Sequence, residues 1–267
     1  MLATFSKKKL KPHKTEYWLY PKIACWKAFK KRVELICMVI LWHLSETRVN
    51  HHLFSIDEKT GIQALERKEI MASGSGKIRR LEFEYKRHGT TCLIGALNVS
   101  NGKLEACQIG PTRKEKDFLN FIKKLCKNIP LTDRITIILD QLNTHKSESL
   151  VRWVAQMINY KGELGTKEYK GILKSQNSRM AFLENPDHRI HLIFTPIHCS
   201  WLNPIENWFS KLQRQRLRNA NFKSLQDLDI ALSKYIKFAN VWFAKPYKWK
   251  FKGFVKNYQL RGMKLRA

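Results

Sequence analysis

Three acidic residues stand where an α/β sheet would bring them to one edge. Asp57 closes a predicted strand, Asp140 closes a second and nearly all-apolar strand, and Glu206 lies in the helix after a third. Ligands of open α/β sheets bind beyond the carboxyl ends of strands, where two such aspartates are neighbours. Clustered carboxylates repel one another unless cations lie between them, and hard oxygen ligands suit Mg²⁺ or Mn²⁺. Two such ions would activate the attacking oxygen and stabilise the leaving oxygen of a phosphodiester.

Each of these acids, taken singly, also fits a helix cap or a surface position, so their spacing alone leaves the site open. The charge of the chain adds a second observation, because 50 Lys and Arg against 22 Asp and Glu give a formal net charge of +28. Residues 1–50 hold 11 basic and 3 acidic residues, and residues 211–267 hold 15 and 2. Such an excess favours nucleic acid or an anionic membrane as partner, although lysine enrichment of solvated faces is the plainer alternative.

Composition excludes several classes of protein. Hydrophobic residues at 43% and aromatic residues at 11% exclude a disordered chain. The six cysteines have no C-x-x-C pair, which argues against structural zinc and fits reduced core cysteines in a cytosolic protein. The longest apolar stretch, 33–44, is too short for a bilayer span, which needs about 20 residues. We therefore expect a cytoplasmic protein without a membrane segment.

The elements that must position the acids follow an α/β order. Apolar periodicity predicts helices over 21–45, 111–126, 147–160, 201–218 and 224–240, and strands over 52–57, 91–99, 103–109, 134–140 and 189–195. Asn101-Gly102 is a strong hairpin turn, residues 72–77 are a connector, and the polar, Gly-rich residues 160–187 interrupt the alternation. Three hairpin-linked strands followed by alternating helices and strands predict an α/β fold with a mixed five-stranded sheet flanked by helices.

Three sequence blocks surround the acids: IDEKTGIQALER at 56–67, LDQLNTHKSE at 139–148 and FTPIHCSWLNPIENWFS at 194–210. Their order resembles the signature blocks of bacterial insertion-sequence DDE transposases of the mariner-related superfamily. The resemblance extends to EYKRHGTTCLIGALNVSNGK and FANVWFAKPYKW, and so covers nearly the whole chain. It implies an RNase H-like catalytic domain over 51–245, which cuts DNA at the ends of a mobile element. The same site then joins the freed 3′-hydroxyl to target DNA, commonly at a TA step.

Carried over position by position, the resemblance implies a catalytic, metal-binding triad of Asp57, Asp140 and Glu206. In the family, the first aspartate contacts two Mg²⁺ ions, which Mn²⁺ can replace, and the other two acids hold one ion each. Glu58 is the nearest rival to Asp57, but alternation along the strand points its side chain to the opposite face. An insertion over 161–188, whose GTKEYKGILKS stretch resembles one branch of the bacterial family, accounts for the long spacing before Glu206.

The family pattern is incomplete at the front of the chain. These transposases normally begin with a helix-turn-helix region that recognises the terminal repeats of the element, and they act as homodimers on paired ends. Here residues 1–50 hold a basic linker and one predicted helix, and residues 246–267 form a basic C-terminal tail. We therefore expect a fragment, a truncated copy, or a chain whose recognition domain is a separate polypeptide.

Basic side chains near these elements are candidates for contacts with DNA, since Lys and Arg position a duplex through its phosphates. The candidates are Arg79, Arg80, Lys86, Arg87, His145, Lys146, Lys211, Arg214 and Arg218. For His145 and Lys146, a helix-entry pair with local hydrogen bonds is an equal alternative. We also expect Asn203 to position the helix of Glu206, and Trp201 to pack in the core.

Three other functions stay open beside a transposase. An RNase H-like nuclease would cut DNA without joining it, and an inactive remnant would bind DNA non-specifically. A basic nucleic-acid-binding protein would need no Mg²⁺, but the intact set of three acids argues against it. No reading predicts a small-molecule substrate, and all of them predict DNA or another nucleic acid as the partner.

Overall fold

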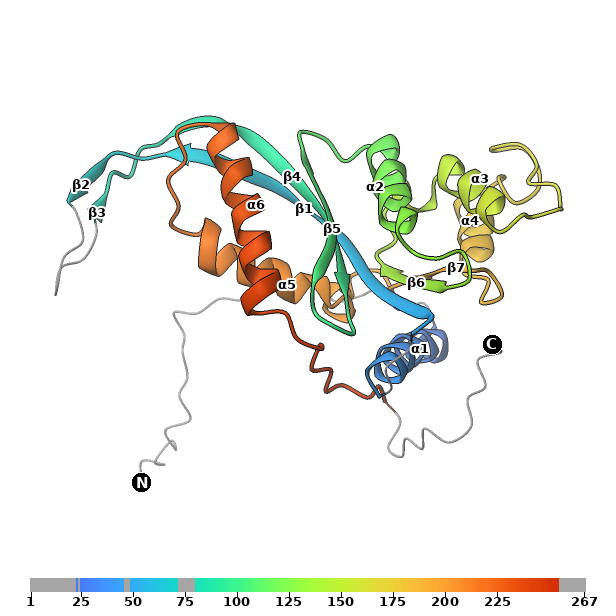
Figure 1. Ribbon diagram of the computed structural model, residues 1–267. Helices are drawn as coiled ribbons and strands as arrows, with labels where there is room; N and C mark the ends of the chain where they lie inside the picture. The colour runs from blue at the N-terminus through green and yellow to red at the C-terminus, as the bar shows by residue number, and fades with distance from the viewer. Residues whose placement is uncertain (1–22, 24, 46–48, 72–79, 255–267) are drawn as a thin grey trace, which may run out of the picture.

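A mixed five-stranded sheet forms the centre of the molecule (Figure 1). This computed structural model describes residues 23, 25–45, 49–71 and 80–254. The strands lie in the order β5-β4-β1-β6-β7, where β1 is His51–Glu66, β4 is Lys86–Asn98, β5 is Leu104–Gly110, β6 is Arg134–Leu139 and β7 is Ile190–Phe194. Strands β1, β4 and β5 pair antiparallel, whereas β6 pairs parallel with both β1 and β7. The structure confirms the predicted α/β fold with a mixed sheet.

Helices cover both faces of this sheet. They are α1 (Trp26–Ser45), α2 (Glu115–Lys127), α3 (Glu148–Met157), α4 (Gln176–Leu183), α5 (Ile205–Leu212) and α6 (Leu225–Trp242), with the short turns η1 (Asn143–Lys146), η2 (Ser200–Leu202) and the π-helical η3 (Gln213–Leu217). Phe54 and Ile56 of β1 share a core with α2, α3 and α4, whereas Leu53 shares one with α1. Successive strand residues point to opposite faces, so the two layers follow from the sequence of β1. Within the described residues, no helix is long and apolar enough to cross a membrane.

β1 is much longer than the sequence predicts. The expectation that the strand ends at Asp57 is wrong, because β1 continues to Glu66. Its pairing with β6 stops at Ser55 opposite Ile138, and beyond that point it continues with β4 alone. A register shift follows Lys59, and Gly61 at φ 67° breaks the alternation that marks a strand. The resulting ribbon runs out of the sheet towards β2 (Glu69–Met71) and β3 (Arg80–Leu81) (Figure 1).

The Gly-rich segment 161–188, which we expect to be an insertion between a helix and the last strand, contributes to the core. It contains α4, whose preceding residue Ser175 caps the helix by accepting a hydrogen bond from the Ser178 backbone N–H. Leu173 and Leu183 are fully buried in the same core as α3. The helix escaped prediction because it is only eight residues long and its apolar residues are consecutive, at 180–183, so they show no helical spacing.

The described parts of the two segments predicted to flank the catalytic domain pack against the sheet. α1 buries Val33 and Ile40 against it, so this helix shares a core with the strands. After α6 the chain turns back along the sheet, where the Tyr247 backbone N–H donates to the Val99 carbonyl at 3.1 Å. Trp249 packs partly buried against the core of α1. The boundaries expected at residues 50 and 245 therefore do not divide the hydrophobic core.

Leu173→Ala tests the contribution of segment 161–188 to the core. The variant should lose about 2–5 kcal/mol of unfolding free energy, because a fully buried leucine leaves a cavity that relaxes only in part. Urea denaturation measures the change. Tyr169→Ala, at a side chain 76% exposed in the same segment, should change stability by less than about 0.5 kcal/mol. Equal effects of the two substitutions would show that the segment lies outside the core.

Candidate active site

The register of β1 against β6 brings the two predicted aspartates to one edge of the sheet. The last parallel pair joins Ser55 to Ile138, and Asp57 and Asp140 each follow two residues later. β6 ends at Leu139, so Asp140 lies at the carboxyl end of the strand, level with Asp57. Asp57 is 9% exposed, while the side chain of Asp140 is 44% exposed. Parallel pairing therefore determines the position of two of the three acids.

Two buried polar residues join the start of α5 to β1. The Ser55 hydroxyl donates to the Asn203 side-chain carbonyl and accepts from the Ile205 backbone N–H at 2.8 Å. The amide of Asn203 donates to Asp57 Oδ2 at 3.1 Å. Glu206, in the first turn of α5, is thereby held close to Asp57. Asn203 lies where the sequence predicts it, positioning the helix that carries Glu206.

The expected continuous helix over 201–218 is broken in two places. Asn203 adopts an extended conformation, as expected for the residue before Pro204, and the π-helical η3 interrupts the helical pattern after Leu212. The expectation that Trp201 packs in the core is wrong. Its side chain is 43% exposed and meets Phe251 edge-on, with ring centroids 5.4 Å apart, because η2 turns it outward ahead of the break.

Electrostatic repulsion links the three acids. Burial raises the pKa of Asp57 to about 7, and the charges of Asp140 and Glu206 act in the same direction. Burial also raises the pKa of Glu206, which the charge of Asp140 raises further and that of Lys59 lowers. The charge of Asp140 thus raises the pKa of both other acids, as expected for carboxylates gathered at one site.

The three acids have the ligand chemistry that a divalent cation requires. Carboxylate oxygens are the ligands that Mg²⁺ prefers in proteins, and the charge of an ion would relieve the repulsion that raises the pKa of Asp57. In the conformation described here, no three His, Cys, Asp or Glu side chains of the described residues are arranged to hold a metal ion. The donor chemistry of a cation site is therefore present in the described residues, without a closed cage of ligands.

Two ion pairs through the buried His145 connect Asp140 to Glu58. Glu58 Oε1 is 2.9 Å from His145 Nε2, and His145 Nδ1 is 2.8 Å from Asp140 Oδ1. Burial alone would lower the pKa of His145, but its hydrogen bonds to the two carboxylates raise it to about 9. Burial by itself would raise the pKa of Asp140, yet the bond to His145 lowers it below its usual value. At neutral pH, a protonated His145 therefore holds Asp140 ionised.

Glu58 points away from Asp57, as alternation along the strand predicts. Its carboxylate reaches His145, whose ring packs against Phe118 of α2 with centroids 4.2 Å apart. Asp57 instead faces Asn203 on the α5 side of the sheet. Sequence reasoning gave Glu58 no role and missed Ser55. The available signal was the presence of polar residues within an otherwise apolar stretch of β1.

The structure corrects two of the proposed DNA contacts and leaves others accessible. His145 is fully buried and Lys146 is 6% exposed, because Arg179 of α4 covers the turn and donates to the Lys146 carbonyl. Neither side chain presents a charge to a phosphate backbone in this conformation. The exposed candidates are Lys86, Arg87, Lys211, Arg214 and Arg218. Arg80 lies in β3, and Arg79 lies outside the described residues.

Comparison with known proteins adds independent findings. Residues 52–229, more than half of the chain, match the family model described as DDE superfamily endonuclease. A crystal structure of the Mos1 strand transfer complex is similar with a TM-score of 0.52 and 14% identity, covering 86% of this chain and 59% of that chain. A pre-cleavage Mos1 transpososome gives a TM-score of 0.52 and 12% identity, covering 86% and 60%. No curated protein matches the chain in sequence.

The chain spans about three fifths of the length of these solved structures. At such low identity the likeness concerns the fold, and it confirms the predicted RNase H-like arrangement. The family match is evidence of membership and not of the fold alone, because it spans the elements from β1 to the first part of α6. Asp57, Asp140 and Glu206 all lie within it. The chain therefore belongs to the DDE superfamily endonucleases, in agreement with the resemblance that its signature blocks indicate.

Proposed function

We propose that this domain is the catalytic part of a transposase, which cuts DNA at the ends of a mobile element and joins the freed 3′-hydroxyl to target DNA. The observation that carries the proposal is the geometry of one sheet edge in a DDE endonuclease domain: Asp57 and Asp140 lie level there, and Asn203 and Ser55 join β1 to the start of α5, which carries Glu206. The similar folds include Mos1 in a strand transfer complex and in a pre-cleavage transpososome. That this chain also cuts DNA and transfers the strand is our inference.

The three acids would hold two Mg²⁺ ions, or Mn²⁺ in their place. Bound there, the ions would activate the attacking oxygen and stabilise the leaving oxygen of a phosphodiester. Asn203 orients the Asp57 carboxylate, and through Ser55 it keeps α5 and Glu206 in place beside it. Protonated His145 keeps the Asp140 carboxylate ionised and oriented.

DNA is the partner in this proposal, both as element ends and as target. The net charge of +28 supports it, as do three exposed cations that follow Glu206: Lys211 on α5, Arg214 on η3 and Arg218 directly after η3. Lys and Arg contacts to phosphate position a duplex without reading its sequence. A homodimer on paired ends, acting on the nucleoid of a bacterial cell, completes the proposal.

A nuclease that cuts but does not join DNA is the second candidate, because the same acids would serve hydrolysis. Incubating the full chain with pre-cut 3′-hydroxyl ends, target plasmid and Mg²⁺ separates the two. Joined products support a transposase, whereas nicked target without joined ends supports a nuclease. A folded chain that forms neither product would be an inactive remnant.

Asp57→Asn should abolish cleavage and stabilise the protein in metal-free buffer. The folded protein keeps the Asp57 proton up to about pH 7, whereas the unfolded chain loses it near pH 4. Wild-type stability should therefore fall as pH rises between these values. The shift from 3.8 to about 7 bounds this fall at about 4 kcal/mol, at about 1.36 kcal/mol per unit, and the variant should lack it. Urea denaturation in EDTA across this pH range measures the difference.

Added Mg²⁺ should then raise the melting temperature of the wild type above pH 7 but not that of Asp57→Asn, because a ligand stabilises only the state that binds it. Asp187→Asn, at an exposed acid before the start of β7, is the matched control and should behave as wild type. Normal cleavage by Asp57→Asn would contradict the proposed mechanism.

Glu58→Gln tests the division of roles between neighbouring acids. The amide still accepts a hydrogen bond from His145 but no longer supports its charge. Because outer partners of metal ligands typically contribute 10–100-fold to activity, cleavage should slow by about that factor. Single-turnover cleavage rates measure it. If Glu58→Gln lost all cleavage activity and Asp57→Asn kept it, Glu58 and not Asp57 would be the catalytic acid.

A further inference from the structure

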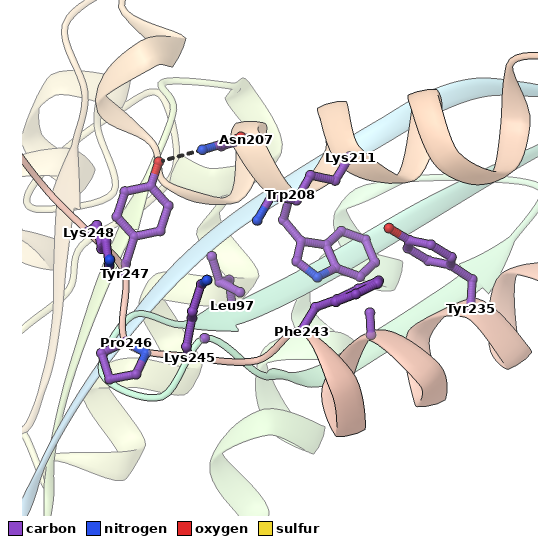
Figure 2. Close-up of a pocket in the computed structure, with 12 residues that line it drawn as sticks. Leu97, Asn207, Trp208, Lys211, Tyr235, Phe243, Lys245, Pro246, Tyr247 and Lys248 are labelled. Atoms are coloured by element: carbon purple, nitrogen blue, oxygen red, sulfur yellow. Dashed lines mark hydrogen bonds between the residues drawn. The ribbon is translucent and has the colours of Figure 1, made fainter.

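An open groove lies between α5–η3 and α6, and we call it the aromatic groove. It consists of two pockets that share Tyr235 and Phe243. The first is bounded by α5, α6 and the chain at residues 245–248 (Figure 2). The second reaches η3. Lys211 lines the groove five residues after Glu206, or about 140° further around the helix. The groove therefore lies on a different side of α5 from the three acids.

Aromatic side chains form the floor and one wall of the groove. Trp208 and Tyr235 are nearly buried, with ring centroids 5.9 Å apart. The Tyr235 hydroxyl donates to Gln215 at 2.7 Å, which ties the floor to η3. Phe238 and Phe243 meet edge-on at 5.2 Å and are 48% and 45% exposed. Two half-exposed rings beside a cavity are available for stacking with a ligand.

The charges around these rings are all positive. Among the described residues, no Asp or Glu lines either pocket, and the lining cations are Lys211, Arg216, Lys234, Lys245 and Lys248. A purely apolar protein segment would not need this set of cations. A positive groove that carries exposed aromatic rings is the combination by which proteins bind single-stranded nucleic acid, because phosphates meet the cations and bases stack on the rings.

The outer wall of the groove is held in place by the protein itself. Gly102 has φ 74°, and a Cβ there would clash with the backbone carbonyl of Lys245. The Tyr247 N–H donates to the Val99 carbonyl at 3.1 Å, and its hydroxyl accepts from Asn207 at 3.2 Å (Figure 2). Because the wall is already ordered, a ligand need not supply the free energy of ordering it.

We propose that the aromatic groove binds a single-stranded segment of DNA. The rings of Phe238 and Phe243 stack with unpaired bases, and Lys211 and Lys245 neutralise phosphates. The bases of duplex DNA cannot stack on these rings, because they are already stacked on one another. An α-helix is about 10 Å across, so a strand in the groove reaches the Glu206 side of α5 within a few nucleotides. The inference rests on the proposed function only in taking DNA as the ligand.

Fluorescence anisotropy with the full chain tests this binding. The probes are labelled oligo-dT and a duplex of equal length, in EDTA at one fixed salt concentration. The double variant Phe238→Ala/Phe243→Ala should weaken oligo-dT binding about tenfold or more, since stacked bases contribute strongly to such sites. Its affinity for the duplex should stay nearly unchanged. Phe238→Leu/Phe243→Leu keeps the apolar bulk and should show the same selective loss, which covers the case in which the alanine variant does not fold.

Two controls make the result specific to the groove. Trp242→Ala removes an aromatic side chain that is 72% exposed on α6 but lines neither pocket, so oligo-dT binding should not change. Asp187→Asn, at an exposed acid that lines neither pocket, should bind oligo-dT as wild type, which shows that a change of surface charge elsewhere does not explain the loss. Equal loss for oligo-dT and duplex, equal loss in Trp242→Ala, or no loss in either double variant would overturn the proposal. So would a change of oligomeric state in the double variants, because the groove would then bind a second copy of the chain.

Discussion

The site depends on the point where β1 parts from β6. Parallel pairing stops at Ser55 and Ile138, and two residues later both strands present an aspartate. Since β1 continues with β4, Asp57 stays within a paired strand and is nearly buried, while Asp140 begins a loop and remains partly exposed. The fold thus places like charges together in a poorly solvated position. Most of the surrounding polar contacts can be understood as support for that arrangement.

The two aspartates receive different support, and their pKa values move apart as a result. Asp140 contacts a buried cation, since His145 is itself held protonated by Glu58. Among the described residues, Asp57 accepts hydrogen bonds from two neutral donors, the Asn203 amide and the Glu58 backbone N–H, and burial keeps its pKa near 7. Environments that separate the pKa values of neighbouring acids are a recurring property of active sites. The asymmetry makes Asp57 the acid whose charge depends most on an added cation.

Much of this organisation could be predicted from the sequence. The apolar run that ends in Asp140 identified a buried parallel strand, and hairpin and helix signals predicted the sheet composition. The extent of β1 could not be predicted, because it depends on pairing with β4 across a register shift after Lys59. The burial of His145 depends on Glu58, 87 positions earlier in the chain. Helix α4 is defined by its packing on α3 and β7, which local periodicity does not record.

The central claim is that Asp57, Asp140 and Glu206 together form a binding site for divalent cations. Anomalous diffraction from crystals of the chain grown with Mn²⁺ tests it most directly, because it locates the ions without reference to activity. We expect anomalous peaks at the carboxyl edge of β6, within coordination distance of Asp57 and of the other two acids. Mn²⁺ bound only elsewhere, or ions at this edge that Asp57 does not contact, would contradict the claim.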